Sequence, residues 1–381
     1  AAWTAFCAVA LAAVALPFAA ALTTGCDPGT ITTSDHYLLS GCSSGSSITI
    51  NPLNDVTLEL DGVTNTRSFT LADGTHNRLT IIARYARINT LVISANVVCN
   101  DCSVFYSHTE LVSTDSFNID ALSLTNFYVQ FNYVFVDRNS VNSELPLLGF
   151  TGDAGASAAS YTNLTFIFQQ CDIRLRTPSG YQRTYQFLRF NQASLTNANI
   201  VFEDTQLTYV HDGSGDFNTM HGLQITGESA HDTFSGVSVT VRNVTVSAAM
   251  NSFASNFNFI TIDPGLNAFT NGNVAIHDSR MTAAGLLGTV TAIEVRNFTN
   301  TDIAVYNTVV DLASTATSGG DVAVIRLHGA MTSSNITVAG SSLRAATPDS
   351  TDASPRLLLV VGVEFVDSHV VFNTSSLALL G

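Results

Sequence analysis

The chain repeats one pattern of apolar and polar positions about every 34 residues. Each unit reads as a short run of alternating apolar residues, a bend of Asp, Asn or Gly beside Ser or Thr, and a second alternating run. The clearest bends stand at Asp204, Asn243, Asp278, Asn307 and Gly340, with Gln170 and Asn373 extending the series. A period of this length is typical of stacked units, each of which buries its apolar face against the next.

Three short strands are predicted in every unit. Alternation with a period of two indicates a half-buried strand and not a helix. A further alternating run follows each bend, for example over 187–190, 259–262 and 324–327. The fold class is therefore predicted to be all-β, a right-handed parallel β-helix (β-solenoid) with three strands per turn. A sandwich or barrel is the alternative, but equivalent bends at a long period favour the solenoid.

One internal column of side chains can be assigned from the register of the repeats. Val241, Ile276, Val305 and Val338 each lie two residues before a bend. Because equivalent positions of a solenoid stack one above another, these four residues are predicted to lie in contact inside the coil.

Composition agrees with an apolar interior and a neutral polar surface. The chain is 46% hydrophobic but only 12% charged, and its formal net charge is −15. All 15 basic residues are Arg, and Lys is absent. The negative charge, with no basic cluster to interrupt it, argues against a nucleic-acid partner.

The two ends of the chain suggest export and a longer array. Residues 1–21 form an apolar run that ends in Ala19-Ala20-Ala21, which is typical of a signal peptide or a signal anchor. Residues 22–62 are expected to form an N-terminal cap and first turn, and residues 63–381 the β-helix repeats. No polar capping element follows the last repeat, so we expect a truncated array. The expected location is extracellular or at the cell surface, with membrane contact only through an N-terminal anchor or a missing C-terminal segment.

Cysteines are expected to form disulfides in an exported protein. Cys26 and Cys42 bracket a hairpin and are expected to pair. Cys99 and Cys102 are expected to form a structural disulfide or to remain two thiols of a loop, and Cys171 to be a buried thiol. As a zinc site the Cys99–Cys102 pair lacks a second pair of ligands, so no metal or cofactor is expected there.

Five Asn-x-Ser/Thr sequons are candidate glycosylation sites: Asn163, Asn243, Asn297, Asn335 and Asn373. The alternative is that they arise by chance in a chain rich in Asn, Ser and Thr, beside bends where Asn suits the backbone.

Candidate catalytic groups are sparse. Acid/base cleavage of a glycosidic bond needs paired carboxylates, and a lyase needs a basic residue to abstract a proton. Asn300-Thr301-Asp302 matches a short motif of polygalacturonases, but Asp302 stands where a bend residue is expected. Asp212, Asp216 and Asn218 offer oxygen ligands for Ca²⁺, although a solvated Gly-rich loop explains the same residues. No catalytic residue is assigned.

The opening of the mature chain resembles the first turns of the pectate-lyase-like superfamily of parallel β-helix proteins. The resemblance lies in the segments 29–32, 37–41, 47–50 and 54–62, and it implies the fold but not an activity. The Ser/Thr/Asn-rich, sequon-bearing repeats with few charges and no Lys resemble the dispersed gene family surface proteins of trypanosomes. That resemblance implies a surface-displayed glycoprotein.

Two hypotheses of function follow. The first is a non-catalytic surface solenoid that adheres to glycans or to proteins of a host surface, and the second is a polysaccharide lyase or glycoside hydrolase. An enzyme should carry three or more Asp, Glu, Arg or His side chains together on one outer sheet face, in a groove. A structural or adhesive rod should carry ladders of Ser, Thr and Asn there instead.

Overall fold

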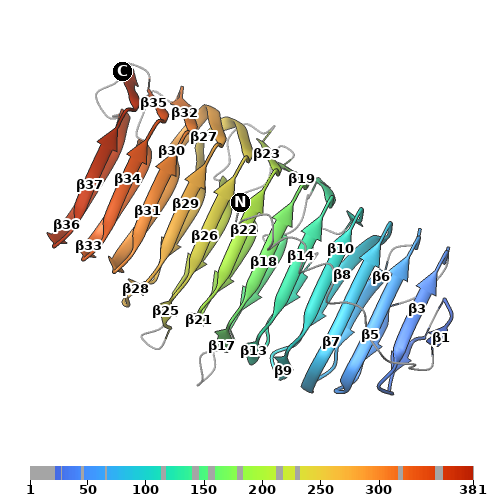
Figure 1. Ribbon diagram of the computed structural model, residues 1–381. Coiled ribbons are helices and arrows are strands. Elements are labelled where there is room, and N and C mark those ends of the chain that lie inside the picture. The colour runs from blue at the N-terminus through green and yellow to red at the C-terminus, as the bar shows by residue number, and fades with distance from the viewer. Residues whose placement is uncertain are drawn as a thin grey trace, which may run out of the picture.

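A computed structural model describes residues 22–26, 28–43, 47–64, 67–112, 117–139, 146–152, 159–177, 183–211, 218–227, 232–315, 321–347 and 355–380. These residues contain no helix and form 38 strands of a single sheet in which the pairings are parallel. The fold is therefore an all-β parallel β-solenoid, as predicted (Figure 1). Within the described ranges no helix is long and apolar enough to cross a membrane. The predicted signal segment 1–21 lies outside them.

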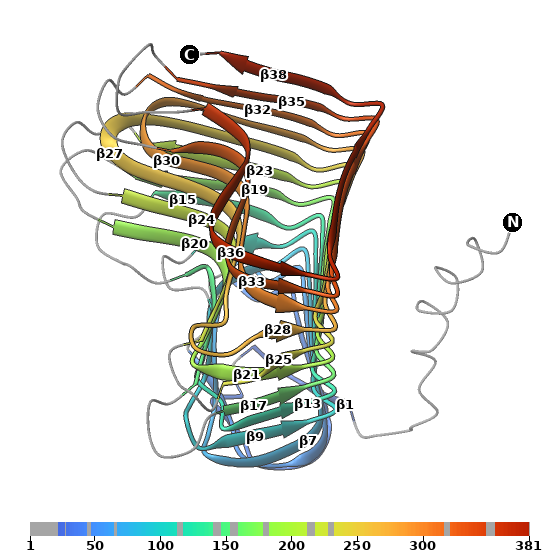
Figure 2. The ribbon, with the colours of Figure 1, turned by 90° about the vertical axis from the view of Figure 1, so that its left-hand side faces the viewer.

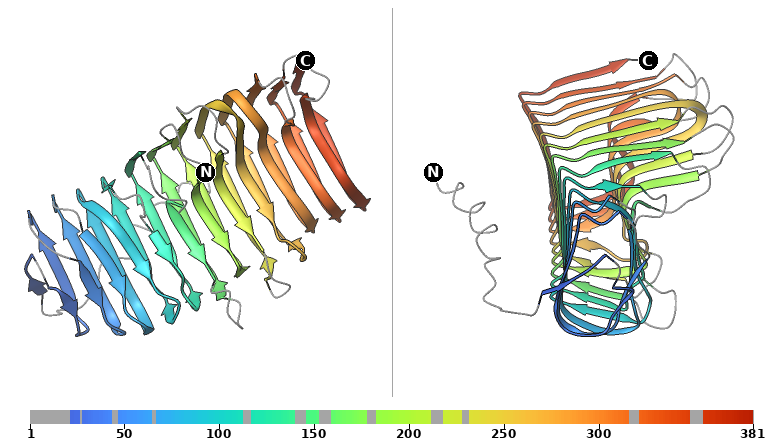
Figure 3. Two further views of the ribbon diagram at one scale, coloured as in Figure 1. Left: turned by 180° about the vertical axis from the view of Figure 1, so that it is seen from behind. Right: turned by 90° about the vertical axis from the view of Figure 1, so that its right-hand side faces the viewer.

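Strands of successive coils lie side by side in four stacks. The first stack runs the length of the molecule (Figures 1 and 3). It contains β1 (Leu22–Thr24), β3 (His36–Ser40), β5 (Asn54–Asp61), β7 (Gly74–Arg84), β10 (Ser103–Ser107), β14 (Tyr128–Asn132), β18 (Thr165–Gln169), β22 (Asn199–Glu203), β26 (Ser238–Arg242), β29 (Asn273–His277), β31 (Asp302–Tyr306), β34 (Asn335–Ala339) and β37 (His369–Asn373).

The second stack follows the first after a sharp bend. It contains β11 (Glu110–Leu111), β15 (Phe135–Asn139), β19 (Asp172–Thr177), β23 (Gln206–His211), the first parts of β27 (Thr245–Asp263) and β30 (Arg280–Thr299), and then β32 (Val309–Ser314), β35 (Ser342–Ala346) and β38 (Ser376–Leu380).

The third and fourth stacks return the chain to the first. The third contains β2 (Thr30–Ile31), β4 (Ile48–Ile50), β6 (Arg67–Leu71), β8 (Arg87–Ile93), β12 (Phe117–Ile119), β16 (Leu148–Thr151), β20 (Arg183–Asn191), β24 (Asn218–Thr226), later parts of β27 and β30, β33 (Val322–Thr332) and β36 (Pro355–Val366). The fourth contains β9 (Val97–Asn100), β13 (Ser123–Thr125), β17 (Ala159–Thr162), β21 (Ala193–Thr196), β25 (Phe234–Ser235) and β28 (Phe269–Thr270), and continues in the ends of β30, β33 and β36.

The number of strands per coil changes along the chain. The last coils have three, for example β31, β32 and β33, because β33 and β36 each run through both the third and the fourth stack. Central coils divide this path into two strands, such as β16 and β17. The prediction of three strands per turn therefore holds for the C-terminal coils. The central coils have a fourth short strand, which the alternating runs in the sequence did not reveal.

Coil length also changes. In the first stack Leu58 pairs with Ile81 and Ile81 with Val104, so those coils hold 23 residues. Later partners, such as Ile200 and Val239, are 39 apart. The period near 34 thus belongs to the later coils. Figure 2 shows where their extra residues go: β19, β20, β23, β24, β27 and β30 extend to one side of the body as a fin.

The predicted internal column is confirmed. Val241 pairs with Ile276, Ile276 with Val305 and Val305 with Val338, and all four side chains are fully buried. Toward the N-terminus the column continues through Phe202, which pairs with Val241. The interior is therefore a continuous stack of apolar side chains.

Bends between the first and second stacks use a left-handed backbone. Asp204, Asn243, Asp278 and Asn307 have φ between 48° and 51°, a conformation that Asn and Asp adopt more easily than other non-glycine residues. Their side chains link adjacent coils, because Asn243 Nδ2 donates to Asp204 Oδ1 at 2.7 Å and Asn307 Nδ2 to Asp278 Oδ1 at 3.2 Å. These four predicted bends are thus confirmed and bond across adjacent coils, whereas the last bend is Thr374, with φ 47°, and not the predicted Asn373, which ends β37.

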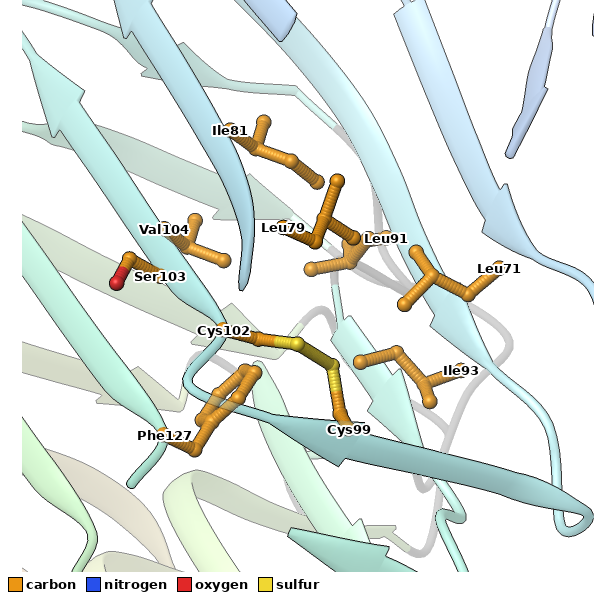
Figure 4. Close-up of a pocket in the computed structure, with 10 residues that line it drawn as sticks. All are labelled: Leu71, Leu79, Ile81, Leu91, Ile93, Cys99, Cys102, Ser103, Val104 and Phe127. Atoms are coloured by element: carbon orange, nitrogen blue, oxygen red, sulfur yellow. A yellow bond between two sulfur atoms is a disulfide. The ribbon is translucent and has the colours of Figure 1, made fainter. Parts of the chain in front are cut away.

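The structure contains two disulfides. Cys26 is bonded to Cys42 (Cα–Cα 5.4 Å) and Cys99 to Cys102 (Cα–Cα 5.9 Å). Figure 4 shows the second disulfide beside a small pocket lined mainly by apolar side chains, which offers a polar ligand little to bind. Cys171 is a free thiol, and burial raises its pKa to about 12, so it stays protonated and unreactive.

Candidate functional site

A row of buried polar side chains crosses four coils on the third stack. Gln186, His221, Asn258 and Thr291 occupy equivalent positions of β20, β24, β27 and β30. Each is more than nine-tenths buried. Polar groups at such burial normally have a structural or functional partner.

A second polar row lies three residues further along the same strands. Arg189, Gln224, Thr261, Glu294 and Arg326 pair in register from β20 to β33. Their sequence neighbours, such as Ile260 and Ile262 beside Thr261, belong to the apolar core. Because successive side chains of a strand point to opposite faces, this second row faces outward. We call the two rows together the polar third-stack face.

Hydrogen bonds join the two rows. Gln186 Nε2 donates to Gln224 Oε1 at 2.6 Å, and His221 Nδ1 lies 3.1 Å from Thr261 Oγ1. Burial, and then the charge of Arg189, lower the pKa of His221 to about 4. The imidazole is therefore neutral near pH 7 and offers one donor and one acceptor.

Three acid–base contacts lie on or beside this face. They join Asp263 to Arg296 (3.2 Å), Asp321 to Arg326 (3.6 Å) and Glu294 to His328 (3.2 Å). Burial and the neighbouring Arg326 lower the pKa of His328 in spite of Glu294. With Arg189, the three arginines balance the three carboxylates, so the face is close to neutral in a chain of net charge −15.

Several buried polar atoms of the face have no hydrogen-bond partner among the described residues. They include Gln186 Oε1, Asn258 Oδ1 and Thr291 Oγ1 of the first row and Arg326 Nε of the second. A buried polar atom without a partner is costly, by about 1–3 kcal/mol. These four atoms are themselves shielded from solvent, so the partners open to them without movement of side chains are enclosed waters.

The candidate motifs from sequence lie elsewhere. Asp302 is exposed at the start of β31 and accepts a hydrogen bond from Asn335 Nδ2 at 3.0 Å, while Thr301 is buried. Asn300 has φ 49° at a corner. The triplet is therefore a bend, as its position suggested, and it is not near the polar third-stack face in the coil.

The structure does not place the candidate Ca²⁺ ligands. Asp212 and Asp216 lie outside the described residues, as does the side chain of Asn218. The described part of the chain contains no group of three His, Cys, Asp or Glu side chains arranged to hold a metal ion.

Four of the five sequon asparagines are exposed: Asn163, Asn243, Asn335 and Asn373. Asn297 is half-buried, and its Oδ1 accepts the backbone N–H of Ala330 at 3.0 Å. The Nδ2 atoms of Asn163, Asn243 and Asn335 also donate within corner ladders. Glycosylation stays a prediction, and Asn297 is the least accessible site.

The polar third-stack face was missed from sequence, although a signal was present. Its second row is the polar residue inside successive alternating runs: Gln224 in Leu-Gln-Ile, Thr261 in Ile-Thr-Ile, Glu294 in Ile-Glu-Val and Arg326 in Ile-Arg-Leu. The first row could not be predicted from the sequence in this way, because the orientation of its side chains depends on a local bend of the folded coil.

Comparison with known proteins assigns no family. No protein-family model and no curated protein matches the chain. The functional argument therefore rests on the fold and on the polar third-stack face.

Proposed function

We propose that this protein is a non-catalytic, secreted or surface-displayed β-solenoid glycoprotein that binds a glycan along its polar third-stack face. The observation that carries the proposal is the outer row of polar side-chain atoms of Arg189, Gln224, Glu294 and Arg326, which are half-buried and are backed by the buried first row. Coils about 4.8 Å apart place these atoms as a regular series of hydrogen-bonding groups. Amide, hydroxyl, imidazole and guanidinium groups together supply the donors and acceptors that sugar hydroxyls require.

Charge favours an uncharged glycan. The carboxylates of the face are balanced by arginines, while the chain as a whole carries −15. A strongly anionic polymer would be repelled by the whole molecule without a local excess of positive charge to offset it. A neutral polymer rich in hydroxyl groups meets no such barrier.

Surface display is supported by three features. The chain carries disulfides, which persist in oxidising compartments. Four sequon asparagines are exposed. The resemblance of the repeats to the dispersed gene family surface proteins of trypanosomes points the same way.

A glycoside hydrolase or lyase is the second candidate, and the face itself favours it. It holds more than three Asp, Glu, Arg and His side chains, which is the cluster, though not the groove, expected of an enzyme. Hydrolysis, however, uses two carboxylates that flank the scissile bond. Here Asp263 contacts Arg296 and Glu294 contacts His328, so each carboxylate is already engaged. We therefore place binding ahead of catalysis.

The test measures binding and turnover on the same samples. The purified protein is titrated by calorimetry against soluble mannan, galactan and β-glucan. Gln224→Ala should weaken binding about tenfold, which corresponds to about 1.4 kcal/mol, because it removes a half-buried amide from the outer row of the face. Thr240→Val, on the outer side of β26 in the first stack, is the control and should bind like the parent.

Release of reducing or unsaturated sugar ends separates the two candidates. We expect none from these polymers or from pectin and alginate, with or without Ca²⁺. Turnover that Glu294→Gln abolishes would replace the binding proposal with the enzyme. Equal affinity of the parent and Gln224→Ala, or no binding to any polymer, would remove the face as a glycan site.

A further inference from the structure

The corner between the first and second stacks changes character in the N-terminal coils. Gly41, Gly62, Tyr85, His108 and Tyr133 occupy this corner in five successive coils, with φ between 49° and 62°. A bulky residue rarely adopts a positive φ. Four of the later coils, from Asp204 to Asn307, place Asp or Asn here, which adopt this backbone more easily than tyrosine, while Gln170 and Thr374 occupy the same corner in two others.

The three aromatic rings form one exposed stack. Ring centroids of Tyr85 and His108 are 4.9 Å apart, and those of His108 and Tyr133 are 4.7 Å apart, with interplanar angles of 27° and 21°. These separations match the spacing between coils, so the ring planes lie across the solenoid axis. Tyr85 is 63% exposed and Tyr133 46%. We call this stack the aromatic corner.

Beyond Tyr85 the corner has no side chains for two coils. A Cβ added at Gly41 would meet no atom within 4 Å, and one at Gly62 would meet only the Gly41 backbone nitrogen at 4.0 Å. One face of the Tyr85 ring is covered by His108. The opposite face therefore borders an open space beside Gly62 and Gly41. This space is about 10 Å long, the height of two coils, and we call it the glycine step.

Hydrogen-bonding groups stand beside this step. Asp61 and Ser40 directly precede the two glycines, pair in register with each other and are exposed. An aromatic face at the end of the step and polar groups along its side form the combination that binds a sugar, whose ring has an apolar face and a rim of hydroxyls.

We infer that the aromatic corner and the glycine step form a sugar-binding subsite in which a pyranose ring stacks on Tyr85 above Gly62. The inference shares only the class of ligand with the proposed function. Its residues lie on other stacks than the polar third-stack face, so either site can fail without the other.

The first test removes the ring. Tyr85→Asn places at this corner the residue that later coils use there, so the fold should persist. Saturation-transfer NMR with methyl glucoside, methyl galactoside and methyl mannoside, and with their linear hexasaccharides, reports binding. We expect at least one of these probes to bind the parent protein and Tyr85→Asn to weaken that binding at least tenfold. Asp204→Asn, at the same corner further along, is the control and should bind like the parent.

The second test fills the step and leaves the ring in place. Gly62→Asn adds a side chain that tolerates positive φ and should block binding as strongly as the loss of Tyr85. Gln224→Ala, by contrast, should leave this subsite unaffected. The inference is overturned if none of the probes binds the parent, or if Tyr85→Asn changes the melting temperature but not the affinity.

Discussion

Within each corner, two neighbouring residues make different hydrogen bonds, one on the outer surface and one inside the coil. Asn307 points outward and bonds Asp278 of the preceding coil. Thr308 points inward, and its hydroxyl accepts the backbone N–H of Ser279 at 3.3 Å. Ser341 repeats the inner bond by accepting the Thr308 N–H at 3.1 Å. Corners interrupt the strands, so these side chains satisfy backbone groups that would otherwise be buried without a partner.

A charge in the internal column should be severely destabilising. Ile276 is buried between Val241 and Val305, and Ile276→Asp would place an unpaired carboxylate among apolar side chains. We expect a loss of at least 3 kcal/mol in the free energy of unfolding, measured by urea denaturation. Ile276→Val is the control and should cost about 1 kcal/mol. An Asp variant that melts within about a degree of the parent would refute the register.

His221 should make the stability depend on pH. The pKa of His221 is about 4 in the folded protein, whereas an ordinary histidine has a pKa of 6.5. The unfolded chain therefore binds more protons between these two pH values. Stability from this residue is complete above about pH 6.5 and is lost as the pH falls toward 4, by roughly 3 kcal/mol. Urea unfolding of the parent and of His221→Gln at pH 7.5, 5.5 and 4.5 measures it. A parallel pH dependence in the two proteins would contradict the assignment.

Among the elements, the N-terminal turn is held by more than strand pairing. β1 pairs with β3 along the exposed end of the first stack. Cys26 and Cys42 are joined by a disulfide, and the fully buried Arg67 donates from Nη2 to the backbone oxygen of Cys26. An open strand edge is a site of unwanted pairing, so these contacts secure the segment that covers it.

Secreted material should contain the Cys26–Cys42 bond. A disulfide across 16 residues stabilises by about 3 kcal/mol, chiefly by restricting the unfolded chain. Peptide mapping under non-reducing conditions decides whether it is present, and Cys171, buried and free, serves as the internal reference for an unpaired thiol. Recovery of Cys26 and Cys42 as free thiols would remove this clamp and weaken the case for export.

At the scale of the whole molecule, the two ends of the solenoid differ. The last described coil exposes the apolar residues that extend the core columns: Phe372 continues the column of Val338, and Leu379 pairs with Ala345. The exposed fraction of Leu379 is 52%. An exposed strand edge with apolar side chains is a template for association.

The 381-residue chain should therefore self-associate through this coil. Phe372→Glu combined with Leu379→Lys should shift the protein toward a monomer, because both changes place charge on the contact surface. Size-exclusion chromatography with light scattering at about 50 µM measures the oligomeric state. Val201→Lys on the outer side of β22, remote from the last coil, is the control. A parent that is already monomeric at this concentration would contradict the expectation.

The solenoid and its register could be predicted because they follow from local alternation and from bends that recur at equivalent positions. The column through Ile276 is the clearest example. The shorter N-terminal coils and the fourth stack were not predicted. Strands of two or three residues, such as β25, carry too little alternation to be recognised, and a period that changes from 23 to 39 residues blurs the repeat.

By itself the sequence determined the parallel stacking, the inner column and the corner residues, because each depends on side-chain periodicity and on the backbone preferences of Asn, Asp and Gly. Only the tertiary structure decided which polar residues meet. Gln186, Asn258 and Thr291 are buried together because the third stack bends beside the fin. Tyr85, His108 and Tyr133 stack because successive coils of 23 and 25 residues place them at one corner. Contacts between coils depend on how the intervening loops close, which no local pattern records.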